Sequence, residues 1–122
     1  LSDLLKGVKR AAERGYVRGL DSRHINVDKG HTALNYLLQG SAAVIAKRWM
    51  VLADDKLKAP FFQHTHQLAF IHDELQYETN PESVKDLMFN LEVSAVEAGE
   101  YYKLRIPIAA EAKSGSNWAE VH

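Results

Sequence analysis

Residues 68–78 read Leu68-Ala-Phe-Ile-His-Asp-Glu-Leu-Gln-Tyr-Glu78, and this stretch carries the strongest structural signal in the chain. Four apolar residues come first, three ionisable residues follow, and apolar and polar residues then alternate. Alternation with a period of two is typical of a strand that has one buried face. The stretch therefore predicts a β-hairpin with a charged turn made of His72, Asp73 and Glu74.

Outward from this hairpin, the spacing of apolar residues predicts helices on both sides. Residues 1–14 and 31–58 have helical spacing, and residues 15–27 between them are typical of a second hairpin. Another helix is expected to begin at Asn80 and Pro81 and to close at Gly99. Residues 104–110 alternate as a final strand, in which Pro107 favours an edge position. The sequence thus predicts an α+β fold, a small antiparallel sheet with long packed helices.

The composition predicts one folded domain. The chain has 122 residues, of which 46% are hydrophobic, enough to bury a core without cross-links. It has no cysteine, which excludes a disulfide scaffold, a thiolate metal site and a cysteine nucleophile. That composition is compatible with a reducing, cytoplasmic setting. No apolar run is long enough to cross a bilayer, so we expect no membrane partner.

The net charge of −1 argues against a nucleic-acid partner when it is taken as a total, but it hides a strong asymmetry. Residues 1–58 hold eleven Lys/Arg and six Asp/Glu, which gives +5. Residues 59–122 hold four Lys/Arg and ten Asp/Glu, which gives −6. Such asymmetry indicates that one half faces a polyanion, although two solvated faces of an ordinary domain would give the same counts.

The carboxylates of the charged turn are candidates for metal binding. Asp73 and Glu74 offer the hard oxygen ligands that Mg²⁺ prefers, and two-metal phosphoryl transfer uses such ligands. A solvated polar turn is the alternative interpretation. A second hypothesis takes His64 and His66 together with His72 and Asp73 as the ligands of a metal-dependent phosphohydrolase. Surface histidines are the alternative there.

A polar stripe precedes a patch of small residues, Gly40-Ser-Ala-Ala43, in the long helix. His31, Asn35 and Gln39 are four residues apart, which places them on one helix face. Amide donors reach the acceptors that every base pair offers in the minor groove, so such a stripe suits any correctly paired duplex. An exposed polar face is the simpler explanation. On its own, the stripe would also fit a non-catalytic duplex DNA-binding module that has no sequence preference.

Four blocks taken together resemble the C-terminal part of a family A DNA polymerase, the group of bacterial polymerase I and the T-odd phage replicases. Residues 15–23 resemble its Gly-Tyr-Val…Leu-Asp-Gly-Arg hairpin, and residues 33–48 its Asn…Gln-Gly-Thr-Ala-Ala…Lys-Arg helix. Residues 71–75 resemble the His-Asp-Glu palm motif, and residues 114–122 the terminal Gly-x-Asn-Trp…His block. His31, in place of an Arg common in bacterial members, favours a phage-like branch.

The resemblance implies roles for individual residues in DNA replication by a two-Mg²⁺ nucleotidyl transfer. Asp73 would be a catalytic metal ligand, Glu74 a neighbouring carboxylate of lesser weight, and His72 would help place the primer end. The implied DNA contacts come from two groups of side chains. Asn35, Gln39 and His31 would meet the primer–template duplex, and the cationic Arg18, Lys47 and Arg48 fit contact with its phosphate backbone on charge alone.

The resemblance also implies how the chain is organised and what it lacks. Residues 1–30 would form a helix and hairpin, residues 31–58 a long DNA-facing helix, and residues 59–122 the palm hairpin, helix and terminal strand. In the family, a second metal-binding Asp and the helix that grips the deoxynucleoside triphosphate lie upstream of these blocks. We therefore expect a fragment or split subunit that is inactive without an upstream polymerase segment, and that exposes apolar surface through which it could form a homodimer.

Overall fold

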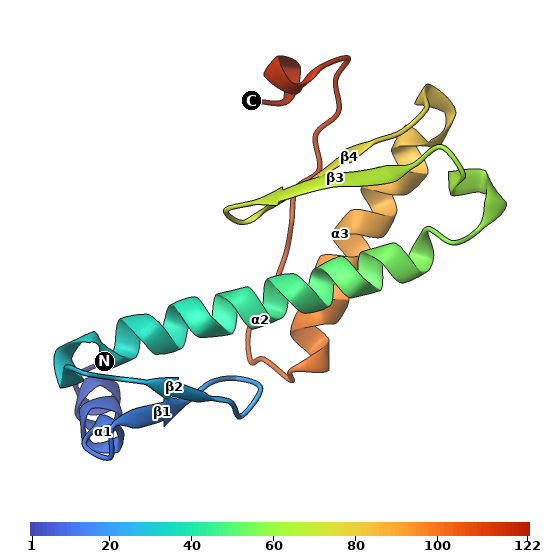
Figure 1. The fold of residues 1–122 in the computed structure, drawn as a ribbon. Helices are drawn as coiled ribbons and strands as arrows, with labels where there is room; N and C mark the ends of the chain where they lie inside the picture. Colours follow the sequence, from blue (N-terminus) through green and yellow to red (C-terminus); the bar gives the residue numbers. More distant parts are fainter. The chain divides into compact units, whose positions relative to one another are not determined.

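A computed structural model describes all residues 1–122 of the protein (Figure 1). Three α-helices and four short strands occur in the order α1 (Ser2–Ala12), β1 (Tyr16–Arg18), β2 (His24–Asn26), α2 (Ala33–Lys56), β3 (His66–Ile71), β4 (Glu74–Glu78) and α3 (Val84–Tyr101). This confirms the α+β class. The strands form two separate antiparallel hairpins, β1–β2 and β3–β4, and not one sheet. None of the helices combines the length and the apolar character that crossing a membrane requires.

The contacts divide the chain into two compact units, Leu1–Ile45 and Ala46–His122. The boundary falls inside α2, so each unit contains one half of that helix. Each unit has its own set of packed elements, and the two are described separately below.

The first unit packs α1 and the β1–β2 hairpin against the start of α2. Gly15 ends the turn after α1 with a φ of 91°, a backbone conformation that favours glycine. The small patch of α2 has a partner in this unit, because a Cβ at Gly40 would lie 2.9 Å from Cδ1 of Ile25. The buried apolar core consists of Val8, Ala12, Val17, Val27 and Ala33.

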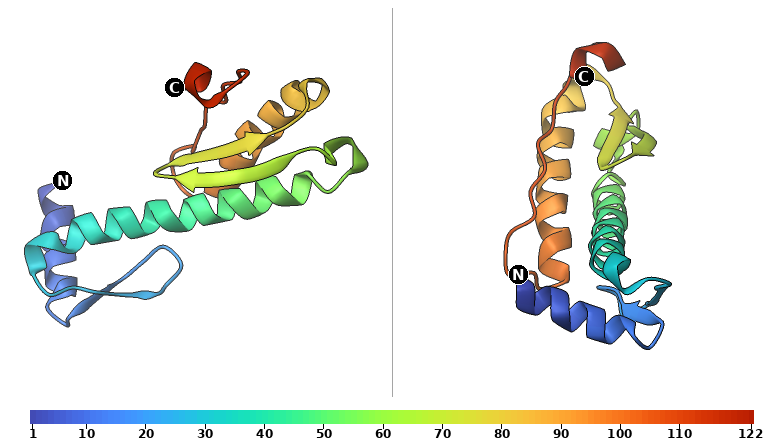
Figure 2. Two further views of the ribbon diagram at one scale, coloured as in Figure 1. Left: turned by 45° about the horizontal axis from the view of Figure 1, so that its top comes forward. Right: turned by 90° about the vertical axis from the view of Figure 1, so that its left-hand side faces the viewer.

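The second unit joins the β3–β4 hairpin, α3 and the second half of α2. The indole nitrogen Nε1 of Trp49 donates a hydrogen bond of 2.8 Å to the carbonyl oxygen of Leu91, and Nζ of Lys56 lies 3.0 Å from Oε2 of Glu97. After α3 the chain turns back and runs along that helix as an extended segment (Figure 2). The backbone N–H of Ala112 donates to Oε1 of Glu92 at 3.1 Å, which ties the segment to α3.

This returning segment corrects two predictions. Residues 104–110 form no strand: Arg105 and Ile106 lie in a bend, the neighbour of the segment is the helix α3, and Pro107 has no N–H to donate. Gly99 does not end the helix, which continues to Tyr101. Gly99 is buried in α3, where a Cβ would come within 2.8 Å of Cγ1 of Ile108. Its missing side chain lets the segment approach.

The start of α3 also differs from its prediction. Asn80 and Pro81 do begin the helical region, but as a 3₁₀ turn, Pro81–Ser83, before α3 starts at Val84. The side chain of Asn80 makes no capping hydrogen bond. The buried hydroxyl of Ser83 instead donates to the carbonyl oxygen of Phe61 at 3.2 Å, which fixes the turn against the preceding loop.

The contact at Gly99 gives a stability prediction with an internal control. Gly99→Ala should lower the free energy of unfolding by about 1–3 kcal/mol, the usual cost of overpacking, because Ile108 must move. Gly7→Ala, in α1, should leave it unchanged or raise it by up to about 1 kcal/mol, since nothing lies within 4 Å of the new methyl group and alanine favours the helix. Urea denaturation followed by circular dichroism measures both. Equal effects of the two variants would contradict the close approach.

Candidate functional site

The tip of the β3–β4 hairpin is a two-residue turn. Ile71 and Glu74 are the last paired residues of the two strands, so only His72 and Asp73 lie between them. His72 has a φ of 59°, as tight hairpin turns require, although Asn and Gly are the usual residues there. The turn is thus shorter than predicted, and Glu74 begins β4 instead of belonging to the turn. His72 and Asp73 are exposed at the tip.

Glu74 is held by two side chains. Nε2 of Gln76 donates to its Oε2 at 2.8 Å, and Nε2 of His122 lies 2.7 Å from the same oxygen. Both hydrogen bonds lower the pKa of Glu74, and the one from Gln76 has the larger effect. The carboxylate is therefore ionised at neutral pH and is engaged on the side that faces His122.

His122 is itself held in place from two directions. Its Nδ1 lies 2.9 Å from the carbonyl oxygen of Trp118, and its ring stacks on the indole of Trp118 with 4.0 Å between ring centroids. The Trp118 carbonyl, and after it Glu74, raises the pKa of His122, while Lys113 acts in the opposite direction. No role was predicted from the sequence for either Trp118 or His122. Their block was recognised only by resemblance, and the contact joins positions 48 residues apart.

The hairpin tip and the segment around Trp118 enclose a shallow pocket of about 360 Å³. Its lining consists of Ile71, His72, Asp73, Glu74, Gln76, Trp118 and His122. Three residues predicted for the catalytic site are therefore together at one pocket. The chemistry of a carboxylate that is exposed at a rigid turn fits a ligand of a divalent cation, and Asp73 is that residue.

The histidines of the phosphohydrolase hypothesis are not gathered into a site. His66 lies on β3, where its Nδ1 is 3.2 Å from Oε1 of Glu78, and His72 lies at the other end of that strand. Among residues 1–122, no three His, Asp or Glu side chains have an arrangement that would hold a metal ion. A cation bound by Asp73 would therefore need further ligands that do not come from such a cluster.

The predicted polar stripe lies in the first unit. His31 belongs to the 3₁₀ turn that precedes α2, while Asn35 and Gln39 lie in α2, and all three side chains are exposed. The opposite face of this part of α2 packs into the core through Ala33 and Leu37. The arrangement leaves a row of hydrogen-bonding groups on one helix face, free to meet a ligand.

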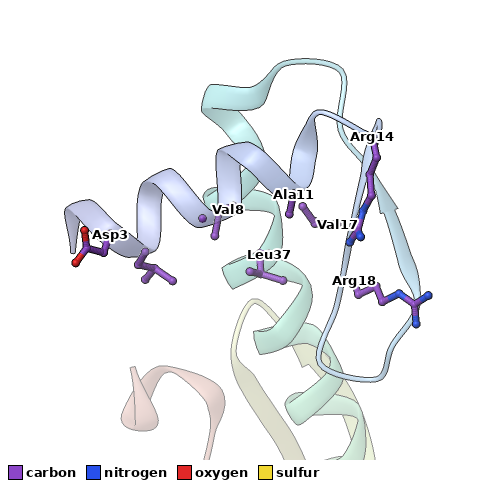
Figure 3. Close-up of a pocket in the computed structure, with 9 residues that line it drawn as sticks. Asp3, Val8, Ala11, Arg14, Val17, Arg18 and Leu37 are labelled. Carbon is purple, nitrogen blue, oxygen red and sulfur yellow. The ribbon is translucent and has the colours of Figure 1, made fainter.

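Arg18 lies on β1, exposed, at the rim of a second shallow pocket of about 390 Å³ (Figure 3). Arg14 lines the same pocket, but its Nε donates to the carbonyl oxygen of Tyr16 at 3.1 Å and its guanidinium lies over the Tyr16 ring. Arg14 is therefore engaged locally. The complete lining is Asp3, Leu4, Gly7, Val8, Ala11, Arg14, Val17, Arg18 and Leu37.

The two cations near the middle of α2 differ in their surroundings. Lys47 is exposed, as contact with a phosphate backbone requires. Arg48 is half-buried, and its guanidinium carbon lies 3.9 Å from the ring centroid of Tyr101 and 5.9 Å from that of Tyr102. This cation–π packing gives Arg48 a role at the end of α3 that its charge alone did not predict.

The pair formed by Glu74 and His122 gives a prediction for pH. The pKa of His122 is raised above its ordinary value of 6.5, so the stabilisation that the pair contributes is complete below pH 6.5 and is lost as the pH rises through the raised value. On the acid side it is lost as the pH falls through the lowered pKa of Glu74. Glu74→Gln should lower the pKa of His122, measured by NMR titration of its ring protons. Glu78→Gln, on the same strand, should leave that pKa unchanged, and a shift of equal size in both variants would contradict the pairing.

Comparison with known proteins identifies the relatives of this chain. The sequence profile of DNA polymerase family A matches residues 8–120. A DNA-directed DNA polymerase of Enterobacteria phage T3 is 32% identical over 116 residues, which cover 90% of this chain and 16% of the relative. DNA polymerase I of Pseudomonas aeruginosa is 31% identical over 125 residues, which cover 93% of this chain and 13% of the relative.

A solved structure agrees with these sequence relatives. The chain is similar to the POL domain of Pol1 from M. smegmatis, solved in complex with DNA primer-template and dNTP, with a TM-score of 0.75 and 27% identity. The similarity covers 88% of this chain and 20% of that one. The chain therefore spans about a fifth or less of the length of these relatives. Because the family profile matches nearly the whole sequence, this chain belongs to DNA polymerase family A.

Proposed function

We propose that this chain is the C-terminal palm part of a DNA-directed DNA polymerase of phage type and that Asp73 is its metal ligand. The observation that carries the proposal is the carboxylate of Asp73, exposed at a two-residue turn between paired strands, in a chain that belongs to a polymerase family. A short turn between hydrogen-bonded strands fixes a ligand better than a flexible loop does.

The proposed reaction is the transfer of a deoxynucleotide to a primer 3′ end. The 3′-hydroxyl oxygen forms a bond to the α-phosphorus of a deoxynucleoside triphosphate, the bond from that phosphorus to the bridging oxygen breaks, pyrophosphate leaves and the hydroxyl proton is released. Two Mg²⁺ ions, when bound, neutralise the charge on the reacting phosphates. Asp73 would hold Mg²⁺ with one carboxylate, while waters, substrate phosphates and the rest of the polymerase supply the other ligands. His72, next to it, would help to place the primer end.

The proposed duplex contacts lie in the first unit and on α2. The exposed Asn35 and Gln39, with His31 before them, offer donors to the minor-groove acceptors that all base pairs share. Arg18 and Lys47 would contact phosphates, which carry most of the affinity of a non-specific binder. Arg48 would act indirectly, because its guanidinium is packed on Tyr101. The +5 charge of residues 1–58 supports this assignment.

The proposed partners follow from the same roles. They are primer–template DNA, deoxynucleoside triphosphates and the polymerase segment that lies upstream in the relatives, all in the cytoplasm of the cell where the DNA is copied. Exposed apolar side chains of β3, including Leu68 and Ile71, support a further contact with that segment or with a second copy of the chain. The polar stripe would also serve a non-catalytic duplex-binding module, which is the second candidate function.

A chimeric polymerase tests the function and separates the two candidates. Residues 8–122 of this chain would replace the corresponding part of the phage T3 polymerase, and primer extension would be measured. Asp73→Asn should reduce the rate more than about 100-fold, beyond the usual effect of losing an outer-shell partner of a metal. Asp86→Asn, an exposed aspartate in the first turn of α3, should leave it unchanged. A chimera that binds duplex DNA but never extends a primer would favour the binding module.

The polar stripe gives a separate prediction. Gln39→Ala should weaken primer–template binding by about 1 kcal/mol, or roughly fivefold in Kd, because one hydrogen bond to the duplex is lost. Fluorescence anisotropy with labelled duplexes measures it, and the loss should be equal for duplexes of different sequence. Gln63→Ala, an exposed glutamine in the second unit, is the matched control. Unchanged affinity for Gln39→Ala would remove this residue from the interface.

A further inference from the structure

The segment that contains Trp118 and His122 is built to meet the hairpin tip. Asn117 begins the 3₁₀ turn Trp118–Val121 by accepting a hydrogen bond of 3.1 Å from the backbone N–H of Glu120. A carboxylate oxygen of Glu120 accepts from the backbone N–H of Ser116. Gly115 lies so close to Glu120 that a Cβ there would come within 2.7 Å of the Glu120 Cβ. The turn is therefore held by specific contacts.

The turn presents one imidazole with each nitrogen engaged. Nδ1 of His122 meets the Trp118 carbonyl oxygen at 2.9 Å, and the stacked indole sets the plane of the ring. Nε2 then meets Oε2 of Glu74 at 2.7 Å. With Nδ1 turned to its own segment, only Nε2 is available to the hairpin. His122 thus connects a rigid turn to a carboxylate that is the direct neighbour of Asp73.

This contact decides which carboxylate at the tip is free. Asp73 and Glu74 are adjacent in the sequence and line the same pocket, and both are hard oxygen ligands. A free Glu74 would compete with Asp73 for a cation and would add negative charge where a polyanionic substrate arrives. The hydrogen bonds from Gln76 and His122 both end on Oε2 of Glu74, whereas Asp73 is exposed at the tip.

We propose that His122, held by Trp118, is a positioning residue that keeps the carboxylate of Glu74 hydrogen-bonded, so that Asp73 is the carboxylate at the tip that would bind the metal. This inference rests on the proposed polymerase function. The segment around Trp118 would then contribute to nucleotidyl transfer together with the residues of the hairpin tip. His122 acts on the reaction through Glu74.

Three substitutions of His122 distinguish the contribution of Nε2 from that of Nδ1. The side-chain amide of His122→Gln places a donor near the position of Nε2, within reach of Glu74. The shorter amide of His122→Asn places one near Nδ1 only, and His122→Ala has neither. In the chimeric polymerase, the alanine and asparagine variants should lower kcat about tenfold, as loss of an outer-shell partner does, with the KM for the triphosphate changed less than about twofold.

The glutamine variant should recover most of that kcat, because it restores the donor to Glu74. His66→Ala is the matched control, since His66 pairs with Glu78 at the far end of the same hairpin. It should leave kcat unchanged. Wild-type kcat in His122→Ala, or equal losses in the glutamine and alanine variants, would overturn the positioning role.

A second readout needs no catalysis. Mn²⁺ binding to the 122-residue chain is measured from the EPR signal of the free ion, and Asp73→Asn should weaken it. In His122→Ala the affinity for Mn²⁺ should rise severalfold because two carboxylates now bind. Glu74→Gln combined with His122→Ala should abolish that gain. An unchanged affinity in folded His122→Ala would count against the inference.

The two readouts separate the inference from the function on which it rests. If the wild-type chimera extends primers and His122→Ala does so at full kcat, the polymerase function stands and the positioning role falls. If the wild-type chimera synthesises no DNA, the proposed function fails, and the Mn²⁺ affinity alone decides whether His122 controls Glu74. If His122→Ala unfolds the hairpin tip, as its amide spectrum would show, His122→Gln supplies the decision: a wild-type affinity for Mn²⁺ supports the role, and a raised affinity overturns it.

Discussion

The second unit depends on a close approach between α3 and the chain that follows it. Gly99 lacks the side chain that would collide with Ile108. The returning segment can then run along α3, where Ala112 is hydrogen-bonded to the helix. That path brings the turn at Trp118 back to the hairpin tip. A bulky residue on this face of α3 would act on the site from a distance.

Two neighbouring carboxylates receive different environments from this geometry. Asp73 lies in the two-residue turn and is exposed, while Glu74 begins a paired strand and is engaged by Gln76 and His122. The positive φ of His72 allows a turn of only two residues. Asp73 therefore lies in the turn, and Glu74 lies in the strand that follows. One carboxylate is thereby exposed at the tip, and the other is hydrogen-bonded within the fold.

The charge asymmetry of the sequence has a structural counterpart. In the basic half, the exposed Asn35 and Gln39 and the cationic Lys47 remain free for a partner, while Arg14 and Arg48 pack on tyrosine rings. Lys56 is paired with Glu97. A guanidinium stacked on an aromatic ring keeps its charge, but it is held in place and is less free to contact a phosphate directly. Formal charge therefore overestimates the number of side chains that can contact a polyanion.

The sequence by itself determined the class, the helices, both hairpins and the exposed Asp73, because local periodicity and turn chemistry dictate these features. It also identified the family, since four ordered blocks survive in a chain of 122 residues. The alternation of apolar and polar residues wrongly predicted a strand at residues 104–110, because such a pattern does not show whether another strand lies alongside to pair with the segment. Only the tertiary structure decided that Arg48 packs on Tyr101 and that His122 holds Glu74. These contacts join residues dozens of positions apart, and no local pattern encodes which distant group fills the space beside a side chain.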